Sequence, residues 1–263
     1  MEDLNIHKTA VVHPSAKLSP GVSIGPYSII EGDVTLGDNV RIGSHCVVTG
    51  QTTLGRNTSV YTGAVIGSPP QIKNPKGNGN VYLSIGENNI IREFVTINPG
   101  TIEGGGKTLV GDNNLLMAYC HIAHDCIIGN NCVLANAATL AGHVILEDTA
   151  VIGGLSGVHQ FVRLGRLCMI GGMSKIVQDV PPFSLCSGQE AKIYGINKVG
   201  LRRAHIPSAT QDKIRKSFKL LFNSGLSRTH AIERIEKEVE PCPEVEHLVF
   251  FMKTSKRGVC GGY

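Results

Sequence analysis

The chain has 263 residues, of which 41% are hydrophobic and 17% charged, with a formal net charge of +4. Aromatic residues make up only 5%, Trp is absent and Gly is abundant at 32 residues, which disfavours a core of ordinary helices or sandwich sheets. The first ten residues lack a signal-peptide pattern, and no stretch approaches the roughly 18 apolar residues that span a bilayer. We therefore expect a cytoplasmic protein without a membrane span.

An aliphatic residue recurs at every sixth position through most of the first 176 residues. The series runs from Ile6 to Ile66, resumes from Ile85 to Ile97, and resumes again from Val110 to Ile176, giving 26 positions that are all Ile, Leu or Val. A period of six fits a short strand followed by a corner, and three such sides close a coil of 18 residues. The pattern predicts a mainly β protein in which residues 1–185 form a parallel β-helix of hexapeptide repeats.

Two residue types mark fixed places within the repeat. Gly often follows the aliphatic residue, as at Gly25 and Gly129, where we expect a corner to need permissive backbone. Five cysteines stand four positions after the aliphatic residue: Cys46, Cys120, Cys126, Cys132 and Cys168. We interpret them as small buried hydrophobic residues, because the chain has no CxxC or paired Cys/His zinc spacing.

The register breaks at residues 67–84 and 98–109, which are rich in Pro, Gly and Asn. These segments cannot continue the stack and should loop outward. Loops held by a rigid scaffold are good candidates for binding elements. For the second, Gly-rich segment, a floppy insertion remains an alternative.

After Ile176 the period of six stops, and residues 186–263 are predicted to form a basic, α-helical C-terminal domain. Ser208 can cap a helix that runs through Phe222, Ser227 can cap another through about Val239, and Pro243 can open a third through about Met252. This domain has 14 Lys and Arg against 8 Asp and Glu, a net +6, whereas the rest of the chain is net −2. The asymmetry points to an anionic partner, and a solvated helical face is the alternative. Nucleic acid is not expected, because the basic residues lack interleaved aromatics.

Four histidines cluster within 39 residues: His121, His124, His143 and His159. In coils of 18 residues, Gly142 and Gln160 fall in the same column as His124, at about 4.8 Å per coil. Gly142 leaves space above His124 and exposes a backbone N–H. A general base next to an N–H donor is what acyl transfer to a hydroxyl requires.

Two alternatives compete with this interpretation. Stacked histidines can bind zinc, as in β-helix carbonic anhydrases, but the four histidines here fall in different columns, so we expect no metal. Solvated histidines with only a structural role are the other alternative, and the nearby loops and Gln160 count against it.

The residues resemble one family in particular. Segments 120–126 (CHIAHDC), 140–143 (LAGH) and 157–162 (GVHQFV) resemble UDP-N-acetylglucosamine acyltransferase of lipid A biosynthesis. Segments 178–183 and 195–203 extend the likeness, which covers essentially the whole chain. The resemblance implies a homotrimer of left-handed β-helices with active sites between subunits. The left hand rests on this resemblance alone, since the general crossover rule favours the right-handed form.

By the same resemblance, the enzyme moves an (R)-3-hydroxyacyl chain from acyl carrier protein to the 3-hydroxyl of UDP-GlcNAc, the first step of lipid A biosynthesis. It uses no cofactor beyond the phosphopantetheine of the carrier, and the basic tail meets that acidic carrier. His124 corresponds to the general base and Gly142 to the oxyanion donor. The remaining positions that the family assigns to substrates are Gln71, Lys73, His121, His143, His159 and Gln160, with Asn197 and Arg203 for the nucleotide and Gly172 and Glu190 at the end of the acyl groove.

The first loop departs from the family pattern. Family members usually read Gln-Asp-Leu-Lys there, but this chain reads Gln71-Ile72-Lys73, so the sugar-contacting Asp is missing and Asn74 is one candidate to replace it. Other functions therefore remain open: an acetyl-CoA O-acetyltransferase, an N-acyltransferase on an amino sugar nucleotide, or a trimeric scaffold without activity. Acyl chain length is also left open.

Overall fold

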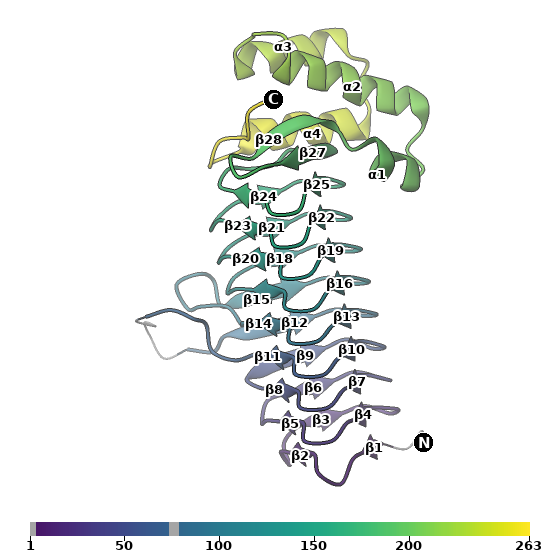
Figure 1. Cartoon of the computed structure of the whole chain (residues 1–263), viewed down its shortest axis with the longest axis vertical. Helices are drawn as coiled ribbons and strands as arrows, with labels where there is room; N and C mark the ends of the chain where they lie inside the picture. The colour runs from purple at the N-terminus through teal and green to yellow at the C-terminus, as the bar shows by residue number, and fades with distance from the viewer. Residues whose placement is uncertain (1–3, 74–78) are drawn as a thin grey trace.

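The computed structural model describes residues 4–73 and 79–263. The described chain winds into a tall prism of short strands, with the N-terminal end at one tip and a group of helices covering the other (Figure 1). Strands β1 to β26 form three parallel sheets, one on each side of the prism. Each of these 26 strands ends on one of the 26 aliphatic positions of the sequence repeat.

Sheet A contains, in spatial order, β1 (Asn5–Ile6), β4 (Ser23–Ile24), β7 (Arg41–Ile42), β10 (Ser59–Val60), β13 (Ile90–Ile91), β16 (Leu115–Leu116), β19 (Val133–Leu134), β22 (Val151–Ile152), β25 (Met169–Ile170), β27 (Ser184–Ser187) and β28 (Lys192–Ile196). Sheet B contains β2 (Val11–Val12), β5 (Ile29–Ile30), β8 (Val47–Val48), β11 (Val65–Ile66), β14 (Thr96–Ile97), β17 (His121–Ile122), β20 (Thr139–Leu140), β23 (Gly157–Val158) and β26 (Lys175–Ile176). Sheet C contains β3 (Lys17–Leu18), β6 (Thr35–Leu36), β9 (Gln51–Leu54), β12 (Tyr82–Ile85), β15 (Lys107–Val110), β18 (Ile127–Ile128), β21 (Ile145–Leu146) and β24 (Arg163–Leu164).

Where no loop interrupts the repeat, strands in successive coils pair residues that are 18 positions apart, as in Ile122 with Leu140 and Leu140 with Val158. The fold is the predicted left-handed parallel β-helix with a C-terminal helical part. Its core is the stack of aliphatic residues that end the strands, all but the first three of which are less than 5% exposed. The five cysteines of the repeat are free thiols and fully buried in the same core, which confirms their interpretation as small hydrophobic residues.

The corners depend on a position that the sequence analysis did not single out. The third residue after most strands adopts the left-handed backbone region, with examples at Asn57 (φ 57°), Asp125 (φ 59°) and Leu155 (φ 58°). The glycines that directly follow the strands have another role, because a Cβ on Gly25 would lie 2.5 Å from the Gly43 carbonyl oxygen of the next coil. Our expectation that these glycines relax the corner was wrong: they allow close stacking of coils, and the third residue turns the chain.

Both ejected loops are present but shorter than predicted. Strand β12 begins at Tyr82 and β15 begins at Lys107, so residues 82–84 and 107–109 lie within sheet C. Alternation of outward and inward side chains in these strands of four residues keeps them on the prism despite their position next to the register break. Asn74, a candidate replacement for the missing loop Asp, lies outside the described residues.

The last turns of the chain form the cap. The predicted domain boundary, between residues 185 and 186, falls inside β27, which pairs in parallel with β25 and antiparallel with β28. The helices are α1 (Lys198–Arg203), α2 (Ser208–Phe222), α3 (Arg228–Glu238) and α4 (Pro243–Thr254). In the described part of the chain, no helix has the length and apolar character needed to cross a membrane.

Two details of the helices differ from the prediction. Helix α1 was not predicted, and it is only 6 residues long, too short for a periodic pattern. Pro207, not Ser208, is the N-cap of α2, and it makes no side-chain cap bond. Ser227 does cap α3, since its side chain accepts a hydrogen bond from the His230 N–H, and α4 begins at Pro243 as predicted.

Candidate active site

The two loops and the histidine pair share one edge of the prism. The first loop leaves the prism after β11 and the second leaves it after β14, in each case at the corner where sheet B passes to sheet C. His124 follows β17, which pairs directly with β14, so it lies at the same corner in the next coil. Figure 1 shows both loops projecting from this one side of the prism. The corner between sheets B and C is therefore the place where the two loops and His124 come together.

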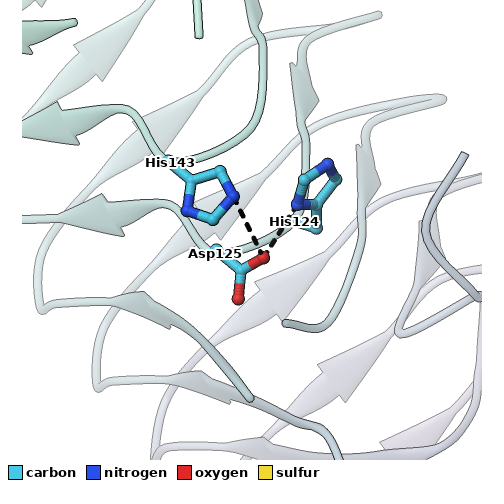
Figure 2. Close-up of side chains that lie close together, drawn as sticks. All are labelled: His124, Asp125 and His143. Atoms are coloured by element: carbon cyan, nitrogen blue, oxygen red, sulfur yellow. Dashed lines mark hydrogen bonds and ion pairs between the residues drawn. The ribbon is translucent and has the colours of Figure 1, made fainter. Parts of the chain in front are cut away.

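His124, Asp125 and His143 converge at this corner (Figure 2). The His124 Nδ1 lies 2.8 Å from Asp125 Oδ2, and the His143 Nε2 lies 3.6 Å from the same oxygen. A carboxylate only accepts hydrogen bonds, so we assign the hydrogen of the His124 ring to Nδ1. The His124 Nε2 then carries the free lone pair, as a general base requires.

The Asp125 side chain is buried and held by hydrogen bonds from Thr101. It is only 1% exposed. The Thr101 N–H donates to Oδ1 at 2.9 Å, and the Thr101 hydroxyl donates to Oδ2 at 2.6 Å. The Asp125 N–H in turn donates to the Thr108 hydroxyl oxygen. A buried carboxylate with this set of donors has a fixed orientation and can hold the ring that it faces.

Gly142 lies directly against the His124 ring. A Cβ at Gly142 would be 2.5 Å from Cε1 and 2.7 Å from Nε2 of His124. The prediction that a bare glycine leaves room over the imidazole is therefore matched by the geometry. Within the described residues the Gly142 amide has no hydrogen-bond partner, so it can donate to an incoming ligand.

Two neighbouring histidines have a pKa below the ordinary value for histidine. Burial lowers the pKa of His143, the Asp125 charge opposes this and His124 adds to it. Burial, and then His124, also lowers the pKa of His121, whose Nδ1 lies 2.7 Å from the Thr96 hydroxyl. The His143 ring is stacked on Phe161, with ring centroids 4.5 Å apart, which fixes its orientation beside His124.

A cleft of about 650 Å³ opens over this cluster. It is lined by Pro70, Ile72, Gly79, Val81, Gly100, Thr101, Ile102, Glu103, Gly104, His124, His143, Gln160 and Phe161. Both loops contribute residues to its walls. The volume falls in the usual range for small-molecule sites.

Some predicted site residues lie away from this cleft. His121 faces outward from β17, and His159 is exposed with its Nδ1 3.2 Å from the Gln160 carbonyl oxygen. Gln71 and Lys73 are exposed on the first loop and do not line the cleft, although their neighbour Ile72 does. The structure therefore brings together His124, Gly142, His143 and Gln160 from the predicted set.

Asn197 and Arg203 line a second cleft of about 800 Å³, formed by the corner between sheets C and A together with β28 and α1. The Asn197 side chain accepts from the Gly200 N–H and donates to the Leu167 carbonyl, so it also caps α1. The predicted acyl-end residues Gly172 and Glu190 are exposed and line neither cleft.

The three convergent side chains could also hold a metal ion, since their ligand atoms lie within 4.8 Å of one another. Around tetrahedral Zn²⁺ with bonds of about 2.1 Å, ligand atoms are roughly 3.4 Å apart, and the two distances to Oδ2 bracket this value. However, the His124 Nδ1 and Asp125 Oδ2 lie at hydrogen-bond distance, 2.8 Å. An ion would have to displace the proton between them, so the arrangement fits a hydrogen-bonded base better.

Sequence reasoning missed two members of this site, Asp125 and Thr101. The repeat placed Asp125 beneath His143, but it gave no sign that the carboxylate faces the ring of the residue before it. The signal available was the pair His124-Asp125 itself. Thr101 gave no signal, because the register break hid which coil its loop returns to.

Three comparisons with known proteins bear on the identity of the chain. A family model described as Udp N-acetylglucosamine O-acyltransferase, domain 2, matches residues 179–260. A model of bacterial transferase hexapeptide repeats matches residues 15–50, 33–68 and 107–142.

The chain is also similar to full-length proteins. It is 47% identical over 255 residues to acyl-[acyl-carrier-protein]–UDP-N-acetylglucosamine O-acyltransferase from Thermodesulfovibrio yellowstonii, covering 97% of this chain and 98% of the relative. The structure of LpxA from Acinetobacter baumannii superimposes with a TM-score of 0.94 at 41% identity, covering 97% of this chain and 99% of that one. UDP-N-acetylglucosamine acyltransferase from Campylobacter jejuni gives a TM-score of 0.92 at 40% identity, covering 98% and 100%.

Proposed function

The chain belongs to the UDP-N-acetylglucosamine O-acyltransferase family, and on this premise we propose that it transfers an (R)-3-hydroxyacyl chain from acyl carrier protein to the 3-hydroxyl of UDP-GlcNAc. The enzyme is an acyltransferase, and this reaction would make it the first enzyme of lipid A biosynthesis, acting in the cytoplasm. The observation that carries the proposal is the His124 Nε2, free toward a cleft while Nδ1 faces the buried Asp125 carboxylate at 2.8 Å.

The mechanism follows from these groups. His124 Nε2 takes the proton of the sugar 3-hydroxyl as the oxygen attacks the thioester carbon of the carrier. Asp125 stabilises the imidazolium that forms, and the Gly142 N–H donates to the oxyanion. The C–S bond then breaks, and the imidazolium returns its proton to the phosphopantetheine sulfur. The hydroxyl and the thioester are thus converted to an ester and a free thiol, and no further reactant is needed.

Substrate binding would be shared between subunits of a homotrimer. The cleft over His124 lies at the corner between sheets B and C, whereas Asn197 and Arg203 line a cleft at the corner between sheets C and A. One subunit cannot bring both corners to one ligand, but in a cyclic trimer a given face meets a different face of its neighbour. Nucleotide contacts from Arg203 would therefore come from the adjacent subunit.

The reaction is tested by incubating the protein with UDP-GlcNAc and 3-hydroxyacyl carrier proteins of different chain length. The mass of the product is then determined by mass spectrometry. We expect one O-acylated nucleotide sugar, formed in a time-dependent way from one preferred chain length. His124→Ala should lower the rate about 10²–10⁴-fold without changing the circular dichroism spectrum. Transfer from acetyl-CoA instead of the carrier, or N-acylation of a 3-amino sugar nucleotide alone, would establish one of the other transferases.

Subunit sharing is tested by complementation. His124→Ala and Arg203→Ala chains should each form weakly active trimers. Mixed trimers should regain activity, because some of their sites combine an intact His124 with an intact neighbouring Arg203. Failure of the mixture to regain activity would place both residues in one subunit's site.

The proposed transfer needs no metal. Treatment with a chelator should leave turnover unchanged, and the purified enzyme should contain no stoichiometric zinc. Full loss of activity on chelation, with recovery on adding Zn²⁺, would instead support a metal held by His124, Asp125 and His143.

A further inference from the structure

Thr101 connects the second ejected loop to the catalytic pair through two hydrogen bonds. Its N–H and its hydroxyl each donate to a different oxygen of the Asp125 carboxylate, at 2.9 and 2.6 Å. The same hydroxyl oxygen accepts the Gly104 N–H at 3.0 Å, so it belongs to the loop's own turn as well. Thr101 lies 24 positions before Asp125 in the sequence, in the loop between β14 and β15, so it is not part of the aliphatic repeat.

The loop is shaped around the carboxylate. A Cβ on Gly104 would lie 2.1 Å from Asp125 Oδ2 and 2.2 Å from Cγ, so the carboxylate fits against the loop only because residue 104 has no side chain. Asp125 thus has both oxygens held from one side, and only Oδ2 also faces His124. The direction of that oxygen fixes the direction of the imidazole.

We propose that Thr101 is a positioning residue for acyl transfer: its hydroxyl holds Asp125 Oδ2 on His124 Nδ1 and so keeps the base in the tautomer with a free Nε2. The inference rests on the proposed function of His124. On this proposal, the orientation of the base at the β-helix corner depends on a residue of the ejected loop, which lies outside the hexapeptide repeat. Since Thr101 and Gly104 also line the cleft, a ligand that displaces this loop also disturbs the base.

Thr101→Val removes the hydroxyl and keeps the shape and the backbone N–H, whereas Thr101→Ser restores the hydroxyl. A hydrogen bond to a charged group is strong enough that its loss, passed on through one residue, should lower kcat about tenfold, with KM for the nucleotide sugar changed less than about twofold. Ser should recover kcat to within about threefold of the wild type. Thr53→Val, on the exposed face of β9, is the matched control and should leave kcat unchanged.

Nitrogen-15 NMR of labelled histidine provides a readout that a merely structural residue would not move. In the wild type, His124 Nδ1 should have the shift of a protonated ring nitrogen and Nε2 that of an unprotonated one. In Thr101→Val the two shifts should move toward a tautomer average, and Gly104→Ala, which pushes the carboxylate aside, should do the same.

The outcomes separate this inference from the proposed function. If His124→Ala is inactive but Thr101→Val keeps full kcat or an unchanged His124 tautomer, Thr101 has no positioning role and the base is unaffected. If Thr101→Ser fails to rescue, the hydroxyl is not the group that matters. If His124→Ala retains activity, the proposed function itself is refuted.

Discussion

Two corners of the prism have the same backbone and opposite uses. At the corner between sheets C and A, the left-handed position is Asn in five coils: Asn39, Asn57, Asn88, Asn113 and Asn131. At the corner between sheets B and C, three successive coils have Asp125, His143 and Phe161 there, with φ from 59° to 66°. Asn adopts the left-handed region at little cost, whereas most other residues lose about 1–2 kcal/mol.

The difference teaches how a repetitive fold accommodates a site. In the asparagine corner the side chains mainly serve the backbone, and Asn57 Nδ2 donates to Asn88 Oδ1 at 3.1 Å up the stack. At the corner between sheets B and C the side chains line the cleft instead, and the Phe161 ring stacks on His143 despite the conformational cost of its backbone. Residues of the two corners can therefore be exchanged one at a time to see which positions the acid–base chemistry needs.

The largest effect should come from Asp125→Asn. Asn tolerates the same backbone, but its amide cannot hold the imidazolium, so kcat should fall roughly 10²–10⁴-fold while the melting temperature changes little. The matched control is Asn131→Asp, the reverse exchange in the asparagine corner, which should retain nearly full kcat. Loss of less than about tenfold in Asp125→Asn would remove the carboxylate from the mechanism.

Gly142→Ala should have the next largest effect. The new Cβ would push the His124 ring, which it would otherwise meet at 2.5 Å, and a shift of about 1 Å at the reacting atoms costs about 10²-fold in kcat. Gly157→Ala is the control, because a Cβ there meets nothing within 4 Å. Steady-state kinetics of both variants decide the point, and equal activities would mean that the ring has room to move.

Smaller effects, on stability, are expected from two single substitutions, one at Thr149 and one at Asn131. Thr149 holds the left-handed position of the asparagine corner with φ 61°, although β-branched residues are poorly suited to it. Thr149→Asn should raise the free energy of unfolding by about 1 kcal/mol, and Asn131→Thr should lower it by about the same amount. Denaturant titration of both variants measures this, and a shift of the same sign in both would contradict the backbone argument.

The smallest effect concerns pH. Because burial lowers the pKa of His121, the unfolded chain takes up a proton below about pH 6.5 while the folded chain resists it. The unfolded state then binds more protons, so the free energy of unfolding falls as the pH drops through that value. His121→Asn should flatten this dependence between pH 7.5 and 5.5, whereas Asn131→Thr should leave its slope unchanged. An unaltered slope in His121→Asn would show that other groups dominate.

Most of the fold could be predicted from the sequence because each coil repeats the same local solution. An aliphatic residue every six positions must face inward, and that alone fixed the end of every strand from Ile6 to Ile176. The place of His124 beside Gly142 followed from the same arithmetic. The prediction was wrong where the repeat is interrupted or ends. This happens at the loop ends near Tyr82 and Lys107, and at helix α1, which has no periodic pattern.

The sequence by itself determined the coil, the inward stack and the column that brings an imidazole against a glycine, because neighbours 18 positions apart are set by the repeat length. Only the tertiary structure decided which loop residue reaches Asp125, and that Asn197 and Arg203 face a different corner from His124. Those contacts involve the ejected loop and the helical cap, which lie outside the repeat, so they depend on how these two segments fold back onto the prism.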